Sequence, residues 1–254
     1  MLTRRQVMLG GAFTIVCGVG PCCAKDRRGR HGFGCVLAED EAEPFLATAT
    51  GQQAYRTGKE SIIASTGNRE FDYALAQTLS RLTDLFGVLP GFAYYDDYDG
   101  ENAYATEVRK MQRVDGTVLY GKRYFLTGMS QPEAPEVVIT ATCAHEFGHI
   151  VQFKHKLIDR LNRGQRTVKR SELHADFFAG YFAGSRKLQK PDYPAAVFAT
   201  DAFSAGDDDV NDKDHHGTPD ERAAAVVRGF ETAFRERRTF SDAIQVGINY
   251  VSRL

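Results

Sequence analysis

The stretch Ala144-His145-Glu146-Phe147-Gly148-His149 decides the fold of this 254-residue chain. Four residues advance an α-helix by about one full turn, so His145 and His149 lie on the same helical face. Two imidazoles at this spacing, with a glutamate after the first, are typical of a helix that binds zinc and carries a general base. The sequence therefore predicts His145 and His149 as metal ligands and Glu146 as a catalytic base.

The segment Ser171-Glu172-Leu173-His174-Ala175-Asp176 offers carboxylates for the same ion. Glu172 and Asp176 are four residues apart on a second expected helix, so both carboxylates face the same way. This spacing predicts Glu172 as the third zinc ligand. Asp176 is expected to accept the spare N–H of a ligand histidine, His145, and so to fix its tautomer.

The neighbouring residues of this second helix are expected to shape its packing. His174 is two residues from Glu172, so its side chain is predicted to point outward and away from the metal. Small residues lie beside the carboxylates, at Ala179, Gly180 and Ala183. They predict a close approach between the second helix and the motif helix.

His155 follows His145 by ten residues, which is the spacing of the third zinc histidine in metzincin peptidases. That arrangement needs a glycine where this chain has Gln152, and a methionine turn downstream, whereas the last methionine is Met129. With glutamine the helix can continue and carry His155 away from His149. His155 is therefore not expected to bind the metal.

The pattern before the motif helix predicts a helix followed by strands. Apolar residues recur at helical spacing from 71 to 86, and Pro90-Gly91 ends this element. Residues 92–125 read as extended, with a turn signal at Asp115-Gly116. Residues 25–67 are rich in glycine and charge, which favours a spacer or weakly ordered arm.

The rest of the chain is expected to be mostly helical. Long helices are predicted over residues 136–153 and from about 169 to 186. A capping box at Thr218-Pro219-Asp220-Glu221 predicts the start of another. Strands followed by helices, without strict βαβ alternation, indicate an α+β domain over residues 68–254, with a small mixed sheet above the motif helix and a helical C-terminal part.

Charge and hydropathy narrow the class of partner. The formal net charge is −1, so no overall basic field attracts nucleic acid. The interior has no apolar run of about 20 residues, which a transmembrane helix needs. The acidic run over residues 206–212 lacks the glycine of an EF-hand loop and is expected to be a solvated turn. The oligomeric state stays open.

The first 24 residues have the layout of a bacterial export signal, with Arg4 and Arg5 before a short apolar stretch. The arginine pair is typical of twin-arginine export, and cleavage is expected after Ala24. The mature protein is therefore predicted to be periplasmic or secreted.

Two cysteines, Cys35 and Cys143, follow this expected signal. Two cysteines are too few for a disulfide framework. Cys143 is two residues before His145, about 200° around the helix, so it is expected in the core. The surroundings of Cys35 support no role as a ligand, and no cysteine is expected at the metal. Whether the two cysteines pair in an oxidising compartment stays open.

Several blocks of the chain resemble the gluzincin metallopeptidases, and most closely a bacterial family of neutral zinc metallopeptidases. These blocks are Cys143 to Gln152, Ser171 to Asp176 with Ala179-Gly180, Gly206-Asp207-Asp208, and His216-Gly217-Thr218-Pro219 with Arg222. The resemblance implies a zincin-like domain that hydrolyses peptide bonds in a peptide or protein substrate. It also implies that Asn102-Ala103-Tyr104-Ala105 is an edge strand along which an extended peptide lies.

The predicted mechanism uses one zinc ion, Zn²⁺, held by His145, His149 and Glu172. The zinc-bound water would give its proton to Glu146 as it attacks the peptide carbonyl. His216 is the candidate oxyanion donor, because it precedes a helix start in a matching block. A loop histidine that merely satisfies this helix start is an equal alternative.

Arg222 and Tyr104 are weaker candidates for the oxyanion donor. Two other classes of protein also stay open. A non-catalytic zinc-binding structural or interaction protein would retain the metal site without turnover, although such sites are usually filled by four protein groups, often cysteines. A deformylase would need a cysteine ligand upstream of the motif helix. Zinc content and a chelator-sensitive peptide-cleavage assay separate the peptidase from the structural protein.

Overall fold

The computed structural model describes residues 34–63 and 65–254, and the export signal expected over residues 1–24 lies outside them. Among the described residues are five strands: β1 (Val36–Leu37), β2 (Thr50–Gln53), β3 (Gly91–Tyr95), β4 (Ala103–Thr106) and β5 (Thr117–Gly121). The helices are α1 (Glu39–Thr48), α2 (Arg69–Phe86), α3 (Lys122–Met129), α4 (Pro135–Lys154), α5 (Ile158–Asn162), α6 (Lys169–Gln189), α7 (Ala196–Ser204), α8 (Pro219–Phe234) and α9 (Phe240–Val251). A small sheet with several helices confirms the predicted α+β class.

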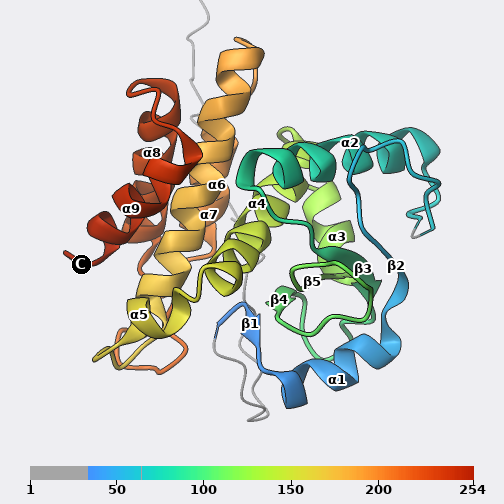
Figure 1. Cartoon of the computed structure of the whole chain (residues 1–254), viewed down its shortest axis with the longest axis horizontal. Helices are drawn as coiled ribbons and strands as arrows, with labels where there is room; N and C mark the ends of the chain where they lie inside the picture. The colour runs from blue at the N-terminus through green and yellow to red at the C-terminus, as the bar shows by residue number, and fades with distance from the viewer. Residues whose placement is uncertain (1–33, 64) are drawn as a thin grey trace, which may run out of the picture.

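The strands form a mixed sheet in the order β1-β4-β5-β3-β2. The β1–β4 and β3–β5 pairs are parallel, whereas the β4–β5 and β2–β3 pairs are antiparallel. Figure 1 shows α4 between two halves of the molecule, with the sheet and α1 to α3 on one side and α6 to α9 on the other. The motif helix is therefore covered by strands on one side and by helices on the other.

Both faces of the sheet are buried, and strand alternation explains how. In β3, Phe92 and Tyr94 belong to the main core that α4 shares, while Ala93 and Tyr95 belong to a smaller cluster on the α1 side. Successive side chains of a strand point to opposite faces. All five residues of β3 are buried for this reason, and they give no alternation of apolar and polar residues.

The described part of residues 25–67 is folded, so the expected spacer or weakly ordered arm is wrong there. β1, α1 and β2 all lie within this range. Leu37 and Ala42 are buried against β3 and β5 in the smaller cluster. The composition is polar because α1 keeps most of its acidic side chains in solvent, and the few apolar residues bury themselves against strands that are distant in the sequence.

The helices agree with the pattern where local signals are strong. Asn68 caps α2 through the backbone N–H of Phe71, and Thr218 and Glu221 form both halves of the capping box of α8. Where the sequence predicts extended structure as far as residue 125, the chain instead turns into α3 directly after β5. The short helices α5, α7 and α9 are additional to the predicted elements.

Glycines set the distances between the long helices. A Cβ at Gly180 would lie 1.9 Å from the carbonyl oxygen of Val226, so this part of α6 packs directly on the backbone of α8. The close contact of α6 with α4 lies elsewhere, where a Cβ at Gly148 would be 3.0 Å from the Cα of Ala175. Gly180 thus allows α6 to pack closely on α8, whereas the small residues of α6 were expected to allow close packing on the motif helix.

Replacing Gly180 by alanine is expected to destabilise the fold, because the added Cβ meets a backbone atom that no rotamer change can move. Overpacking of this kind costs about 1–3 kcal/mol, measurable as a lower urea midpoint. Val227→Ala is the matched control on α8, since Val227 is 48% exposed and such surface changes stay within about 0.5 kcal/mol. Equal midpoints for both variants would contradict this packing.

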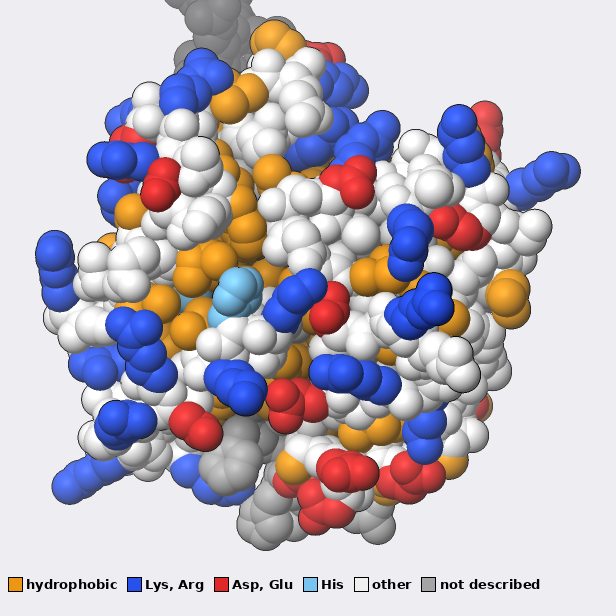
Figure 2. Space-filling model, in the orientation of Figure 1, with side chains coloured by type: hydrophobic (Ala, Val, Ile, Leu, Met, Phe, Trp, Pro, Cys, Tyr) orange, Lys and Arg blue, Asp and Glu red, His pale blue; other side chains and the backbone are white. Residues whose placement is uncertain are grey.

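No helix within residues 34–63 and 65–254 is long and apolar enough to cross a membrane. Figure 2 shows acidic side chains gathered over α1, whose first turn contains Glu39, Asp40 and Glu41. Basic side chains are spread over the rest of this face.

Candidate metal centre

The site is built on α4, which is buried on all sides. Residues 139–153 of this helix are all buried, between the sheet and α6. A helix in such a position is normally apolar all round. The buried polar side chains of His145, Glu146, His149 and Gln152 are exceptions, and buried polar groups need partners to offset their desolvation.

The structure brings the three predicted ligands together. The Nε2 atom of His145 lies 3.1 Å from Nε2 of His149 and 3.2 Å from Oε2 of Glu172. The Nε2 atom of His149 lies 3.6 Å from Oε1 of Glu172. Two helices, α4 and α6, therefore present two imidazole nitrogens and a carboxylate to one point.

Cys35 is a fourth member of this cluster, whereas the sequence predicted no cysteine beside the candidate ligands. One ligand atom from each of Cys35, His145, His149 and Glu172 lies within 4.8 Å of all the others, and all four residues are buried. This group could hold a metal ion. Neither Cys35 nor Cys143 is in a disulfide, so both are thiols in this structure.

Backbone hydrogen bonds hold Cys35 in place. Its N–H donates to Oε1 of Glu172 over 3.2 Å, across 137 residues of sequence, and its carbonyl accepts from the N–H of Ala105 over 2.9 Å. The second bond leads into the parallel β1–β4 pair, where Val36 lies opposite Ala105. The resemblance implied that β4 is an edge strand. This is wrong, because β1 occupies that edge of the sheet.

Gly34 lets this segment pass close to the ligands. Its φ is +68°, and a Cβ there would lie 2.4 Å from Oε1 of Glu172 and 3.2 Å from Nε2 of His216. Glycine alone adopts this backbone conformation without cost and leaves the space free. The same contacts place His216 beside the ligand cluster.

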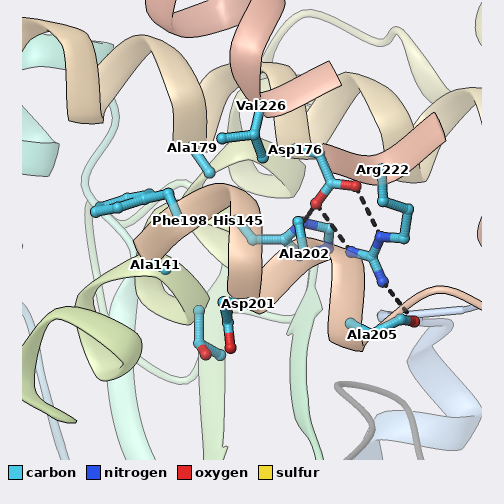
Figure 3. A pocket seen from close by; sticks show the side chains of 11 residues that line it. Ala141, His145, Asp176, Ala179, Phe198, Asp201, Ala202, Ala205, Arg222 and Val226 are labelled. Atoms are coloured by element: carbon cyan, nitrogen blue, oxygen red, sulfur yellow. Dashed lines mark hydrogen bonds and ion pairs between the residues drawn. The ribbon is translucent and has the colours of Figure 1, made fainter. Parts of the chain in front are cut away.

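Asp176 and Arg222 support His145 from behind, as Figure 3 shows. The Nδ1 atom of His145 lies 2.8 Å from Oδ1 of Asp176, the contact that the sequence spacing predicts. Arg222 donates to both carboxylate oxygens of Asp176, over 2.7 and 2.8 Å, and to the carbonyl of Ala205 over 3.1 Å. These hydrogen bonds of Asp176 with Arg222 and with His145 fix the imidazole so that Nε2 faces the cluster. Arg222 thus orients Asp176, and its predicted role as an oxyanion donor finds no support in these contacts.

A small cavity of about 10 Å³ lies beside His145 and Asp176 and is lined in part by Asp201 and Arg222. Such a volume holds about one water molecule. Burial raises the pKa of Asp201 to about 7, although the nearby Arg222 opposes the shift. Burial therefore favours the protonated form of this further carboxyl group near His145.

Gln152 supports His149 in the same way, a role that the sequence did not predict. Its Oε1 lies 3.0 Å from Nδ1 of His149, and its Nε2 donates to the carbonyl of Ser171 over 2.7 Å. The i+3 spacing from His149 on α4 is the signal that could have found it. Gln152 therefore links the second ligand to the start of α6.

His174 is buried, so its expected outward position is wrong, although it points away from the cluster as predicted. Its ring packs against Phe178 with centroids 4.3 Å apart, and a Cβ at Gly247 of α9 would lie 2.8 Å from it. Burial lowers the pKa of His174 to about 3. The neutral ring is part of the α6–α9 contact.

The charges of the cluster are strongly coupled. Burial alone would lower the pKa of His145, but the carboxylates of Asp176, Glu172 and Glu146 together raise it to about 10. Burial would raise the pKa of Glu172, but His149 and His145 hold it well below its usual range. Glu146 is fully buried and directly follows His145 on α4.

The candidate oxyanion donors differ in position. Asp207, in the predicted acidic loop, accepts the backbone N–H of His216 over 3.1 Å and so holds this histidine near the cluster. The ring of Tyr104 packs instead against Phe45, with centroids 5.2 Å apart on the α1 side of the sheet. His216 is therefore the donor candidate that the structure places beside the ligands.

A larger groove of about 1020 Å³ opens at the C-terminal end of α4. Its lining includes β1, the residues after β4, and both Gln152 and Ser171, which connect to His149. The groove therefore reaches the residues that support the cluster.

No known protein family, curated protein or solved structure matches the chain.

Proposed function

We propose that this protein is a zinc-dependent metallopeptidase of the gluzincin type, which hydrolyses peptide bonds in a peptide or protein substrate. The observation that carries the proposal is the convergence of His145, His149 and Glu172 from two helices. Two imidazoles and one carboxylate are the ligand set of peptidases with a catalytic zinc. Nitrogen and sulfur donors favour zinc over magnesium or calcium, which prefer oxygen.

The residues fit such an ion, and each has a defined task. A bound zinc ion supplies a Lewis acid and lowers the pKa of a coordinated water from 15.7 to about 7. Glu146, which is not among the ligands, accepts a proton on its carboxylate and passes it to the leaving amine. His216 donates to the developing oxyanion, supported by Asp207.

The support behind the ligands fits this role. Asp176 and Gln152 hold the Nδ1 atoms of the two histidines, which leaves both Nε2 atoms for the ion. The large groove at the end of α4 offers concave surface for a substrate. The arginine pair near the N-terminus supports export to the periplasm or the medium as part of this proposal.

Cys35 favours a second candidate, a non-catalytic zinc-binding protein. With Cys35 the cluster offers four protein groups, and structural zinc sites are usually closed in this way. The buried carboxylate of Glu146 beside His145 has no task in such a site. The peptidase is therefore the better explanation of the whole cluster.

The test combines metal identification by mass spectrometry with digestion of a peptide library. It uses the wild-type chain and Cys35→Ala, each with chelator and after zinc is restored. One zinc per chain and chelator-sensitive cleavage by either form support a peptidase. Bound zinc with no cleavage by either form would establish the structural alternative.

Asp176→Asn is expected to weaken zinc binding. The amide keeps an oxygen near His145 but loses the charge, and outer partners of this kind contribute about 10–100-fold in metal affinity. Competition with a zinc-chelating dye measures the change. Asp242→Asn, at the start of α9, is the control and should bind zinc as the wild type does. An unchanged zinc affinity in Asp176→Asn would show that the charge of this carboxylate does not contribute to zinc binding.

A further inference from the structure

We propose that residues 34–37 are an internal inhibitory segment, which keeps the peptidase latent by placing the Cys35 thiolate on the metal and β1 on the edge of β4. The proposal rests on the proposed function, because it describes how the same site is regulated. Its occupant is part of this chain, and release of the segment opens the site to a peptide.

The first support is the position of the thiol. Cys35 supplies a sulfur within 4.8 Å of the ligand atoms of His145, His149 and Glu172. Three protein ligands leave one position of a tetrahedral zinc site for water, and a fourth protein ligand fills it. A thiolate is a strong ligand for zinc, so it competes well with water for this position.

The second support is the backbone of the segment, which lies as an extended ligand would. Val36 and Leu37 pair with Ala105 and Thr106 of β4. Strand addition at a sheet edge is a general mode of peptide binding, because the backbone supplies most of the hydrogen bonds. A substrate peptide cannot pair with β4 while β1 is there.

The third support is burial. Cys35, His149 and Glu172 have no exposed surface, and His145 is only 3% exposed. Part of this cover is the segment itself, since Gly34 lies directly over Glu172 and beside His216. A substrate therefore needs the segment to move before it can reach the ligands.

The segment is suited to displacement. β1 has two residues and lies at the sheet edge, and short edge elements open at low free energy compared with a core. On opening, the departing Cys35 thiolate would take a proton from solvent and a water would fill its position on the ion. This exchange of ligands changes no oxidation state and needs no oxidant or reductant. Ala42 of α1, just after the segment, stays buried in the smaller cluster, so the segment remains tethered and can return.

The first test measures the sulfur–metal bond without an activity assay. Cobalt replaces zinc in the full chain, and a thiolate ligand gives a charge-transfer band in the near ultraviolet. We expect this band in the wild type and in Cys143→Ala, but not in Cys35→Ala. Absence of the band from the wild type would overturn the proposal.

Alkylation by iodoacetamide gives a second readout. Cys35 is expected to react at least about tenfold faster after chelation of the metal, because ligation no longer holds the segment closed. Cys143 is the internal control, since it lies in the main core and burial raises its pKa. Equal rates for Cys35 with and without metal would contradict ligation.

The third test is cleavage of the peptide library. Cys35→Ala is expected to cleave at least about tenfold faster than the wild type, since a competing internal ligand reduces the competent fraction. Gly34→Ala keeps the thiol but forces the segment away from Glu172, so it should weaken the cobalt band and raise cleavage too. Circular dichroism confirms that both variants are folded.

The outcomes separate this proposal from the proposed function. Equal cleavage by the wild type and Cys35→Ala would overturn the inhibitory segment and leave the peptidase standing. Loss of zinc and stability in Cys35→Ala, without cleavage by any form, would make Cys35 a structural ligand and overturn both.

Discussion

Replacing Glu146 by glutamine is expected to abolish peptide hydrolysis while zinc content and fold stay unchanged. The amide has the shape of the carboxylate but cannot accept a proton, and general-base catalysis contributes about 10²–10⁴-fold. Glu146 is fully buried beside His145 and is not one of the clustered ligands, so the change leaves the donor set intact. Initial rates of library cleavage measure the loss.

The experiment is best carried out in both the wild-type and the Cys35→Ala chain, so that a closed inhibitory segment cannot imitate the loss of the base. Glu136→Gln is the matched control, because Glu136 lies in the exposed first turn of the same helix. It should cleave as its parent does. Normal cleavage by Glu146→Gln in the Cys35→Ala chain would show that another group accepts the proton.

The part of the site that the sequence predicts is the part set by helical spacing. His145 and His149 are one turn apart on α4, and Glu172 and Asp176 are one turn apart on α6, so the period of the helix alone aligns each pair. The capping box of α8 is equally local, and both of its hydrogen bonds are present. Such signals depend on residues at most four apart.

The missed part of the site depends on contacts between distant segments. Cys35 reaches Glu172 across 137 residues, through the register of β1 on β4. Arg222 reaches Asp176 across 46 residues, through the close packing of α6 on α8. No local pattern encodes a strand register or a helix contact of this kind, so a lone cysteine after a glycine gave no usable signal.

The same reason explains the folded segment between residues 36 and 53. Its composition is polar, and a window of this composition favours disorder. Ala42 and Leu37 nevertheless bury themselves, because β3 and β5 already offer an apolar face on the α1 side. Tertiary burial of a few side chains overrides average composition, and Cys35, the fourth member of the cluster, directly precedes this segment.

Replacing His149 by alanine is expected to remove zinc and the stability that zinc provides. Loss of a direct ligand should cost more than the about 10–100-fold that loss of an outer partner costs. It also leaves Oε1 of Gln152 buried without the imidazole that it now faces, and it removes one of the two imidazoles beside the buried carboxylate of Glu172. Unmet buried polar groups cost about 1–3 kcal/mol each, so the metal-free variant is itself less stable.

Thermal unfolding with and without added zinc measures both effects. A ligand that binds only the folded state raises the melting temperature, so the wild type should shift with zinc and His149→Ala should not. His155→Ala is the matched control, because His155 is exposed at the C-terminal end of the same helix and should keep the full shift. A full zinc shift in His149→Ala, or its loss in His155→Ala, would mean that the ion is held by a different set of residues, and the chemistry assigned to Glu146 would lose its basis.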